Sequence, residues 1–344
     1  MSQTLIKNAN ILSMDSNRSV YIDSAILVED NDIKEIGKLE TFESRVSHQA
    51  NIEDAKENWI LPGLINTHVH TSQHLARGIA DDVDLLVWLH DRIWPYESVL
   101  TEEDSYISSL LCGLEQIRSG VTCFAEAGGQ HVNGMGRAVK ELGIRAALSK
   151  STMDMGEGLP KVWEKNTQEE IDTQLENFEK WNGQENNRIK VWFGLRTIFN
   201  NSDDLIIKTK ELADQHKVGV HMHVAEIREE IEFAKKTRGD STVKHLEKLG
   251  VLDKNFLAVH CVWMTDEEIE IFLKNDVKVS HNPGAAMRVL GFAEIPLMVN
   301  KGICVSIGTD GAPSNNRMSL IDEMWLTSLI HKGRKLDPKV IPAE

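Results

Sequence analysis

Hydrophobic and polar residues follow one another in two different patterns along this chain. In the first 58 residues, the apolar residues form short β-rich runs at residues 5–14 and 21–29. The second run meets residues 32–36 through the polar turn Asp30-Asn31-Asp32. Strand-like runs separated by polar turn residues predict short β-strands in this part of the chain.

From Trp59 onward, apolar strand-like runs alternate with amphipathic helical segments. Residues 104–119 carry apolar side chains at steps of three and four, and residues 204–216 and 266–275 behave similarly. Thr265 and Glu268 have the spacing of a capping box at the start of the last segment. The strand-like runs lie at residues 59–66, 121–126, 144–149, 189–195, 218–224, 256–261, 277–280 and 303–308. This alternation predicts parallel strands covered by helices, and eight such units favour a closed (β/α)8 TIM-like barrel.

Composition and charge narrow the function classes. Hydrophobic residues make up 41% of the chain and charged residues 26%, which is typical of a chain with a large buried core. The net charge of −15 argues against a nucleic-acid partner, because phosphate neutralisation needs a basic face. No apolar run approaches the roughly 20 residues that span a bilayer. The N-terminus lacks a basic-then-apolar signal pattern, so we expect no membrane partner and a cytoplasmic location.

Two histidines follow the first strand-like run of the second pattern. In a barrel, chemistry collects at the carboxyl ends of the strands. His68 and His70 stand two residues apart, so on an extended strand both imidazoles face the same way and can reach one cation. An isolated pair of this kind is more often found on a surface, but this pair follows the apolar run 59–65. We therefore predict that both histidines are metal ligands.

The fifth run contains a second pair of histidines, His221 and His223, with Glu226 three residues further on. Both histidines share a face, and both are able to bind a metal in principle. His223 lies nearer the mouth of the barrel, so we predict it as the ligand and His221 as a hydrogen-bonded histidine of the lumen. Glu226 is placed to move protons at a substrate beside the metal. The alternative is an acid at a helix N-terminus, where the helix dipole favours negative charge.

Asp310 and His260 complete the candidate site. Asp310 ends the last strand-like run, in a segment where a turn-forming aspartate is also common. His260 ends the sixth run, either as a core histidine or as a hydrogen-bond partner of a metal-activated water. Within this set, three imidazoles and one carboxylate around an open position suit one divalent metal ion, Zn²⁺ or Fe²⁺.

Five motifs, taken together and in this order, resemble the amidohydrolase superfamily, in the branch of cytosine- and adenosine-type deaminases and s-triazine hydrolases. The overall likeness is to the 5-methylthioadenosine/S-adenosylhomocysteine deaminases and triazine-hydrolase-like proteins. The motifs are Pro62-Gly63-Leu64-Ile65-Asn66-Thr67-His68-Val69-His70, His223-Val224-Ala225-Glu226, Val259-His260-Cys261, Ser280-His281-Asn282-Pro283 and Gly308-Thr309-Asp310-Gly311-Ala312-Pro313-Ser314-Asn315-Asn316.

The resemblance implies a role for each candidate residue. It assigns the metal ligands to His68, His70, His223 and Asp310. It assigns Glu226 to protonate a ring nitrogen, His260 to position the attacking water, and Asp310 to accept and deliver protons. Trp88 is expected to stack on the heterocycle, and Arg196 to bind a substrate oxygen or carboxylate. Arg196 stands where two-metal members of the superfamily carry a lysine, which implies a single ion, with Zn²⁺ favoured and Fe²⁺ as the alternative.

The function implied by the resemblance is a metal-dependent hydrolytic deaminase, a hydrolase of non-peptide carbon–nitrogen bonds. It releases ammonia from an amino-substituted aromatic heterocycle of the adenosine type or a related purine or pyrimidine. Leu86 stands where adenosine-type members hold the ribose with a glutamate, which leaves the sugar part of the substrate open. The main alternative is an s-triazine chlorohydrolase or aminohydrolase. A two-metal cyclic amidase, an inactive scaffold and a homo-oligomeric state are also considered.

The resemblance also completes the predicted domain organisation. Residues 59–344 form the hydrolase barrel, and residues 1–58 form the N-terminal part of a small β-sandwich. The chain stops at Ile341-Pro342-Ala343-Glu344, where the family begins another helix and then returns strands to the sandwich. We therefore expect the C-terminal part of the fold to be missing.

Overall fold

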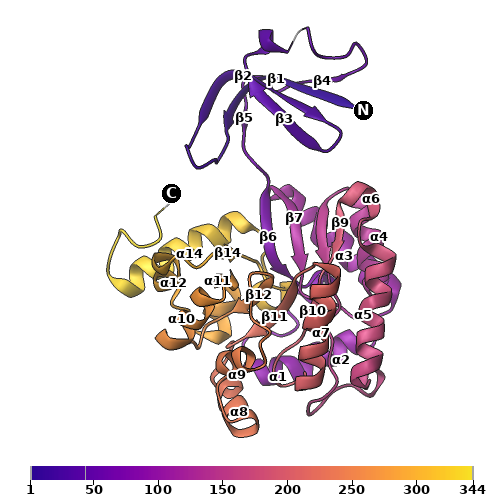
Figure 1. Ribbon diagram of the computed structural model, residues 1–344, viewed down its shortest axis with the longest axis vertical. Helices are drawn as coiled ribbons and strands as arrows, with labels where there is room; N and C mark the ends of the chain where they lie inside the picture. Colours follow the sequence, from indigo (N-terminus) through magenta and orange to yellow (C-terminus); the bar gives the residue numbers. More distant parts are fainter. Residues whose placement is uncertain (1, 43, 343–344) are drawn as a thin grey trace. The chain divides into compact units, whose positions relative to one another are not determined.

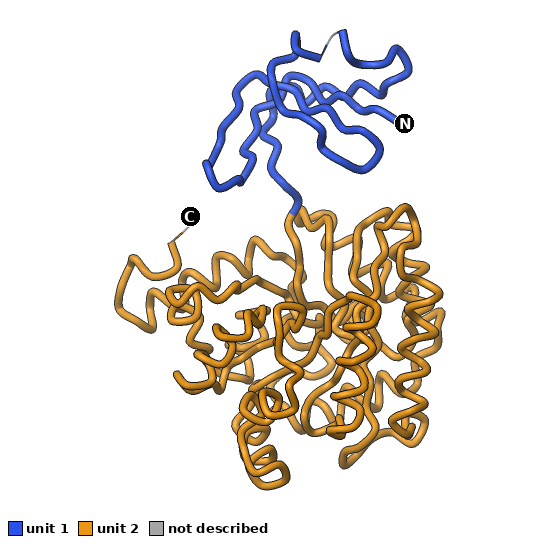
Figure 2. Tube along the Cα trace, in the orientation of Figure 1, with its two compact units in different colours: residues 1–63 blue, residues 64–344 orange. Residues whose placement is uncertain are grey.

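The computed structural model describes residues 2–42 and 44–342, and the chain divides into two compact units. Figure 2 shows unit 1, Met1–Gly63, and unit 2, Leu64–Glu344, in different colours. Within the described part of the chain, no helix has both the length and the apolar character that crossing a bilayer requires.

Unit 1 is built around one mixed sheet with the order β3-β2-β1-β4, and β5 pairs with β1 beside β4. The β1–β2 and β2–β3 pairs are antiparallel, whereas β4 and β5 run parallel to β1. Leu5, Ala25, Leu27 and Phe42 form one apolar cluster of this unit. Its elements are β1 (Gln3–Leu12), β2 (Val20–Glu29), β3 (Asp32–Gly37), the short 3₁₀ helix η1 (Leu39–Thr41), β4 (Asn51–Asp54) and β5 (Trp59–Ile60).

Unit 2 has an α/β core of parallel strands, and helices surround these strands (Figure 1). The strands form two sheets in chain order. The first sheet contains β6 (Leu64–Val69), β7 (Val121–Glu126), β8 (Arg145–Leu148) and β9 (Ile189–Val191). The second contains β10 (Phe193–Leu195), β11 (Val220–Val224), β12 (Phe256–His260), β13 (Lys278–His281) and β14 (Val305–Ile307). The prediction of parallel α/β structure is confirmed.

Among the described residues the hydrogen-bonded ladder of the strands is interrupted at two places, so the predicted barrel is not seen as one continuous closed sheet. Trp192 separates β9, which pairs with β8, from β10, which pairs with β11. At the other seam, β14 and β6 are linked by single hydrogen bonds: Thr67 Oγ1 donates to the Ile307 carbonyl oxygen at 3.1 Å. The predicted fourth strand is thus two short strands, because its residues change partners at Trp192.

The first predicted run, residues 59–66, is also divided. Its first two residues form β5 in the sheet of unit 1, and β6 of unit 2 begins at Leu64. Leu61-Pro62-Gly63 lies between them. Proline has no N–H to donate to a strand ladder, so the ladder is interrupted at this point.

Helices connect the parallel strands, and each of the three predicted helices is present. They are α3 (Glu102–Arg118), α7 (Asp203–His216) and α10 (Asp266–Lys274). The predicted capping box at α10 is confirmed, because Thr265 Oγ1 accepts from the Glu268 amide and the Glu268 carboxylate accepts from the Thr265 amide. Other helices of unit 2 are α4 (Val132–Leu142), α5 (Thr167–Trp181), α6 (Gln184–Asn187), α8 (Arg228–Arg238), α9 (Thr242–Lys248), α12 (Ile295–Lys301) and α14 (Leu320–Lys335).

Helix α3 packs with a different face than its apolar stripe predicts. The residues it buries are small or polar: Ser105, Ser108, Ser109, Cys112, Gly113 and Gln116. Four apolar residues of the predicted stripe in residues 104–119 are exposed instead: Ile107, Leu111, Leu114 and Ile117. The small side chains allow the helix to approach α4 closely: a Cβ added to Gly113 would lie 2.2 Å from Leu142. The orientation of α3 therefore follows from how closely its small side chains allow it to approach α4, and not from where its apolar side chains lie.

Short helical segments follow several strands and surround the strand ends. After β6 come the 3₁₀ helix η2 (Thr71–Ala76), α1 (Leu85–Val87), the π-helix η3 (Trp88–Ile93) and α2 (Trp94–Ser98). After β8 comes the 3₁₀ helix η4 (Lys161–Trp163), after β13 come α11 (Pro283–Ala285) and the π-helix η5 (Ala286–Leu290), and after β14 comes α13 (Ala312–Asn315).

Gly308 lies at the seam between β14 and β6, and its substitution provides a test of this packing. A Cβ at Gly308 would lie 2.4 Å from Asn282 Oδ1 and 2.8 Å from the His68 main-chain nitrogen. We expect Gly308→Ala to destabilise the protein by about 1–3 kcal/mol, because neither group can move without disturbing a strand. Gly333→Ala on α14, where an added Cβ meets no atom within 4 Å, should stabilise by up to about 1 kcal/mol. Urea unfolding midpoints measure both, and a wild-type midpoint for Gly308→Ala would contradict the packing.

Candidate metal centre

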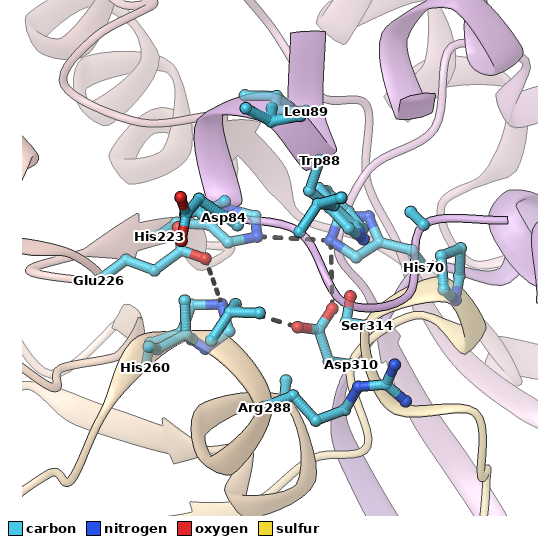
Figure 3. A pocket seen from close by; sticks show the side chains of 18 of the residues that line it. His70, Asp84, Trp88, Leu89, His223, Glu226, His260, Arg288, Asp310 and Ser314 are labelled. Atoms are coloured by element: carbon cyan, nitrogen blue, oxygen red, sulfur yellow. Dashed lines mark hydrogen bonds and ion pairs between the residues drawn. The ribbon is translucent and has the colours of Figure 1, made fainter. Parts of the chain in front are cut away.

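A cavity of about 870 Å³ lies at the carboxyl ends of the parallel strands. Figure 3 shows its histidines and carboxylates pointing toward one another. The walls of the cavity include most of the predicted site residues: His70, Trp88, Arg196, His223, Glu226, His260 and Asp310. His68 is completely buried, and its ring centroid lies 5.1 Å from that of His70. The structure therefore brings all of the predicted site residues together.

The four predicted metal ligands are distributed over two overlapping groups, His68–His70–Asp310 and His68–His223–His260, in each of which the ligand atoms lie within 4.8 Å of one another. His223 Nε2 and His70 Nε2 are 3.4 Å apart, and Asp310 Oδ1 lies 3.5 Å from His68 Nε2 and 3.7 Å from His70 Nε2. Two ligand atoms that are each about 2.1 Å from a tetrahedral zinc ion are about 3.4 Å from one another. The spacing of these side chains therefore fits one ion of that size.

Unpaired nitrogen atoms provide a second indication of a cation. Among the described residues, His68 Nε2 and His70 Nδ1 are buried without a hydrogen-bond partner. A buried polar atom left unpaired costs about 1–3 kcal/mol. A cation bound at His68 Nε2 removes this cost at that atom, whereas the protein itself offers it no hydrogen bond.

The charge state and orientation of the imidazoles suit metal binding. Burial, and then the positive charge of Arg196, lowers the pKa of both His70 and His223 well below the ordinary value of histidine. The rings are therefore neutral, as metal ligands must be. His223 Nδ1 donates a hydrogen bond to the Arg196 carbonyl oxygen at 2.9 Å, which leaves the Nε2 lone pair directed at the cluster.

Asp310 is held in place by the main chain at the end of β14. It adopts a left-handed conformation, with φ of 61°. Its amide donates to the His68 carbonyl oxygen at 3.0 Å, and its Oδ1 accepts from the Gly311 amide at 2.6 Å. Burial alone would raise its pKa, but the surrounding imidazoles of His68, His260 and His70 outweigh burial and hold the pKa of Asp310 well below its usual range. Asp310 is therefore ionised, as a metal ligand requires.

Glu226 faces the cavity and not the start of a helix. Its Oε1 lies 3.5 Å from His260 Nε2, while the amides of Ala225 and Glu226 both donate to the carboxylate of Glu230, at 2.8 Å each. The carboxylate that accepts the main-chain amides just before α8 is thus that of Glu230, which favours the cavity role for Glu226 over the helix-terminus alternative. Burial, and then the charges of Asp310 and Glu230, raises the pKa of Glu226 to about 8.

Asn282 determines which nitrogen of His260 carries the proton. The amide nitrogen of Asn282 donates to His260 Nδ1 at 3.2 Å, so the ring is a donor at Nε2. That Nε2 lies 3.5 Å from Glu226 and 3.9 Å from Asp310. His260 also lies within 4.8 Å of His68 and His223 and shares a possible metal-binding group with them. The Asn282 hydrogen bond favours a hydrogen-bonding position for His260 over a ligand position.

The two predicted substrate-binding side chains both line the cavity. Trp88 begins η3 and is 6% exposed. Arg196 follows β10 and is also 6% exposed, and within the described chain its guanidinium takes part in no hydrogen bond or ion pair. A buried guanidinium without a partner is unfavourable, because charge is removed from water without compensation. Its position in the wall makes it available to an acceptor in the cavity.

The sequence prediction missed several residues around the predicted site. Asn282 was visible in the motif after the seventh run, but only its place at the end of a strand was noted. Arg288 and Asp81, which form an ion pair at the wall of the cavity, carried no motif at all. His281 also ends the seventh strand, but it is buried against His331 of α14, with ring centroids 5.5 Å apart, and does not line the cavity.

Histidines and carboxylates gathered at the ends of parallel α/β strands, at a spacing that fits one cation, are typical of the metal-dependent hydrolases of the α/β class. The chain belongs to the amidohydrolase family, and the match covers residues 59–343. The resemblance inferred from the five motifs is therefore confirmed.

Several deaminases are similar to this chain. The 5'-deoxyadenosine deaminase of Methanobrevibacter smithii is 39% identical over 338 residues, which cover 98% of this chain and 75% of the relative. The 5-methylthioadenosine/S-adenosylhomocysteine deaminase of Syntrophomonas wolfei is 36% identical over 98% of this chain and 76% of the relative. The prediction of a hydrolase of the deaminase branch is confirmed at the level of these relatives.

Solved structures share the fold. A zinc-bound adenosine deaminase from Xanthomonas campestris has a TM-score of 0.90 at 25% identity, covering 99% of this chain and 76% of the other. The zinc complex of atrazine chlorohydrolase TrzN from Arthrobacter aurescens TC1 has a TM-score of 0.87 at 22% identity, covering 98% and 78%. The second likeness concerns the fold alone.

Zinc binding is expected to stabilise the protein through His68. A ligand present at 100 times its dissociation constant adds about 2.7 kcal/mol to the stability of the folded state. Zinc added to metal-free protein should therefore raise Tm, and His68→Ala should lose most of this rise. His48→Ala, at an exposed histidine of unit 1, is the control and should keep it. An equal zinc-dependent rise in His68→Ala, measured by calorimetry, would remove His68 from the metal centre.

Proposed function

We propose that this protein is a metal-dependent hydrolytic deaminase that releases ammonia from an amino-substituted purine, pyrimidine or adenosine-type nucleoside. One observation carries the proposal: a single cavity joins a buried cluster of imidazoles and one ionised carboxylate to a second carboxyl group, Glu226, that is protonated at neutral pH. Relatives named as deaminases over nearly the whole chain support the same reaction.

The proposed metal ligands are His68, His70, His223 and Asp310, and the proposed ion is a single Zn²⁺, with Fe²⁺ as the alternative. Three nitrogen ligands and one oxygen ligand suit either ion. Zinc in the solved structure of the Xanthomonas campestris adenosine deaminase supports the first choice. When bound, such an ion supplies a nucleophile at neutral pH, because it lowers the pKa of water from 15.7 to about 7.

The two carboxyl groups divide the proton transfers between them. Asp310, being ionised, accepts a proton from the attacking water at a carboxylate oxygen and later delivers it to the leaving amine. Glu226, being protonated, donates to the ring nitrogen beside the amino-bearing carbon, so that the tetrahedral intermediate avoids an unstabilised anion. Environments that push two pKa values apart in this way are typical of an acid and base pair. His260, a donor at Nε2, positions the water between them.

Trp88 and Arg196 are the proposed substrate contacts. The indole of Trp88 lines the cavity and offers an aromatic face for the heterocycle. The guanidinium of Arg196 carries donors only, so it requires an acceptor on the substrate, either an oxygen or a carboxylate. Its unpaired state in the protein supports this role.

The finer points of architecture also belong to the proposal. We infer that the predicted domain of residues 59–344 is the catalytic domain from Leu64 onward, because β5 belongs to the sheet of unit 1, and that it is arranged as a TIM-like barrel whose seams lie at Trp192 and between β14 and β6. We infer that residues 1–58 contribute to a small β-sandwich. A cytoplasmic location and a homo-oligomeric state stay predictions from the sequence and the resemblance.

Metal-analysed protein assayed for released ammonia provides the test of this function. The panel contains adenosine derivatives, free purines and pyrimidines, and aminotriazines, with a chlorinated triazine assayed for chloride. We expect ammonia from at least one adenosine-type or base substrate, no chloride, and loss of the activity after chelation. Chloride release without ammonia would replace the proposal with the chlorohydrolase alternative.

Replacement of Glu226 tests the proton donor. We expect Glu226→Gln to keep its metal content and to lower kcat/KM by about 10²- to 10⁴-fold, the usual contribution of general acid catalysis. Because the pKa of Glu226 is raised to about 8, its carboxyl is protonated below that pH and ionises above it. The wild-type kcat/KM should therefore decline on the alkaline side. Glu232→Gln, at an exposed position of α8, is the control. An unchanged rate for Glu226→Gln would exclude it as the acid.

A further inference from the structure

We propose that His221 is a positioning residue that fixes the proton of His68 on Nδ1 and thereby keeps the Nε2 lone pair of His68 available to a metal ion. This inference rests on the proposed role of His68 as a ligand. It assigns a function to the first histidine of the fifth strand-like run, which the sequence analysis treated only as a hydrogen-bonded lumen residue.

A chain of two hydrogen bonds joins His68 to the main chain of a neighbouring strand. His68 Nδ1 lies 3.0 Å from His221 Nε2, and His221 Nδ1 lies 3.1 Å from the Glu126 carbonyl oxygen. His68 is 0% exposed and His221 is 2% exposed, so water does not compete for these bonds. The chain runs inside unit 2 from β6 through β11 to β7.

The chemistry of each group determines the direction of both bonds. A main-chain carbonyl oxygen only accepts, so His221 must carry its proton on Nδ1. In the neutral ring, His221 Nε2 is then an acceptor. His68 Nδ1 must therefore donate to it, and the other nitrogen of His68 carries a lone pair. That nitrogen is the one that lies 3.5 Å from Asp310 and has no hydrogen-bond partner among the described residues.

The carbonyl group at the end of this chain is firmly held. Glu126 ends β7, where it pairs with Val69 of β6. The same carbonyl oxygen also accepts a hydrogen bond from Ser149 Oγ at 2.7 Å. The accepting carbonyl group is therefore part of the sheet itself. Through the two hydrogen bonds, its fixed position also fixes the ring of His68. Outer partners of this kind typically alter metal affinity by about 10- to 100-fold when they are removed.

The inference predicts that the hydrogen bonds of His221 matter for zinc affinity, beyond the space that its ring fills. Phenylalanine keeps a ring at this position but can neither donate nor accept. Glutamine has both a donor and an acceptor on its terminal amide, so it can take the place of both ring nitrogens. We expect His221→Phe to bind zinc about 10- to 100-fold more weakly than the wild type, and His221→Gln to remain within about threefold.

Zinc affinity is measured by competition with a chromogenic chelator, on full-length protein whose folding is checked by its melting curve. His281→Phe is the control, because His281 is equally buried in unit 2 but faces His331 and not the metal cluster. Its zinc affinity should equal that of the wild type. Wild-type affinity in His221→Phe, or an equal loss in His221→Gln and His221→Phe, would overturn the inference.

A measurement on the unmodified protein provides an independent test. Nitrogen-15 NMR of the histidine rings in metal-free protein distinguishes protonated from unprotonated nitrogens. We expect both His68 and His221 to carry their protons on Nδ1, and a proton on His68 Nε2 would overturn the inference even if a variant fails to fold. Because neither readout depends on turnover, absence of deaminase activity would leave these results intact. His68→Ala separates a failure of this inference from a failure of the metal site. If His68→Ala loses zinc binding and His221→Phe keeps it, the metal site holds and only the role of His221 is wrong.

Discussion

The rest of this structure depends on one constraint. Several imidazoles and a carboxylate are removed from water where the strand ends converge on one cavity. Buried imidazoles become neutral because charge is costly away from water. Among the described residues, this buried cluster leaves His68 Nε2 without a hydrogen-bond partner. A divalent cation bound there would give such a nitrogen atom a partner. The surrounding residues are arranged as a site for such an ion requires.

The same burial gives the two carboxyl groups opposite properties. Asp310 lies among imidazoles and accepts a main-chain hydrogen bond, and its pKa is lowered. Glu226 is buried near the acidic groups of Asp310 and Glu230, and its pKa is raised. Two residues of similar chemistry therefore differ in protonation within one cavity, as the proposed base and acid require. Neither behaviour is a property of the residue type, because each follows from its neighbours.

Main-chain groups and amides around the cluster determine the orientation of its rings. The Arg196 carbonyl oxygen holds His223, and the Asn282 amide makes His260 a donor toward the cavity. These contacts come from loops and strands that are distant in the chain. Together they determine which ring nitrogens carry protons. A group of histidines without such contacts would have no preferred arrangement of protons.

The sequence by itself determined the residue types and their approximate places. Period-two spacing placed His68 and His70 on one face, strand ends identified His223, His260 and Asp310, and the capping box at Thr265 followed from local hydrogen bonding. The orientation of α3, the change of partners at Trp192 and the departure of His281 from the cavity were decided by the tertiary structure. These outcomes depend on close packing and on pairing between distant strands, which local patterns do not encode. The hydrogen bond between His221 and His68 belongs to the same class, because its partners are 153 residues apart.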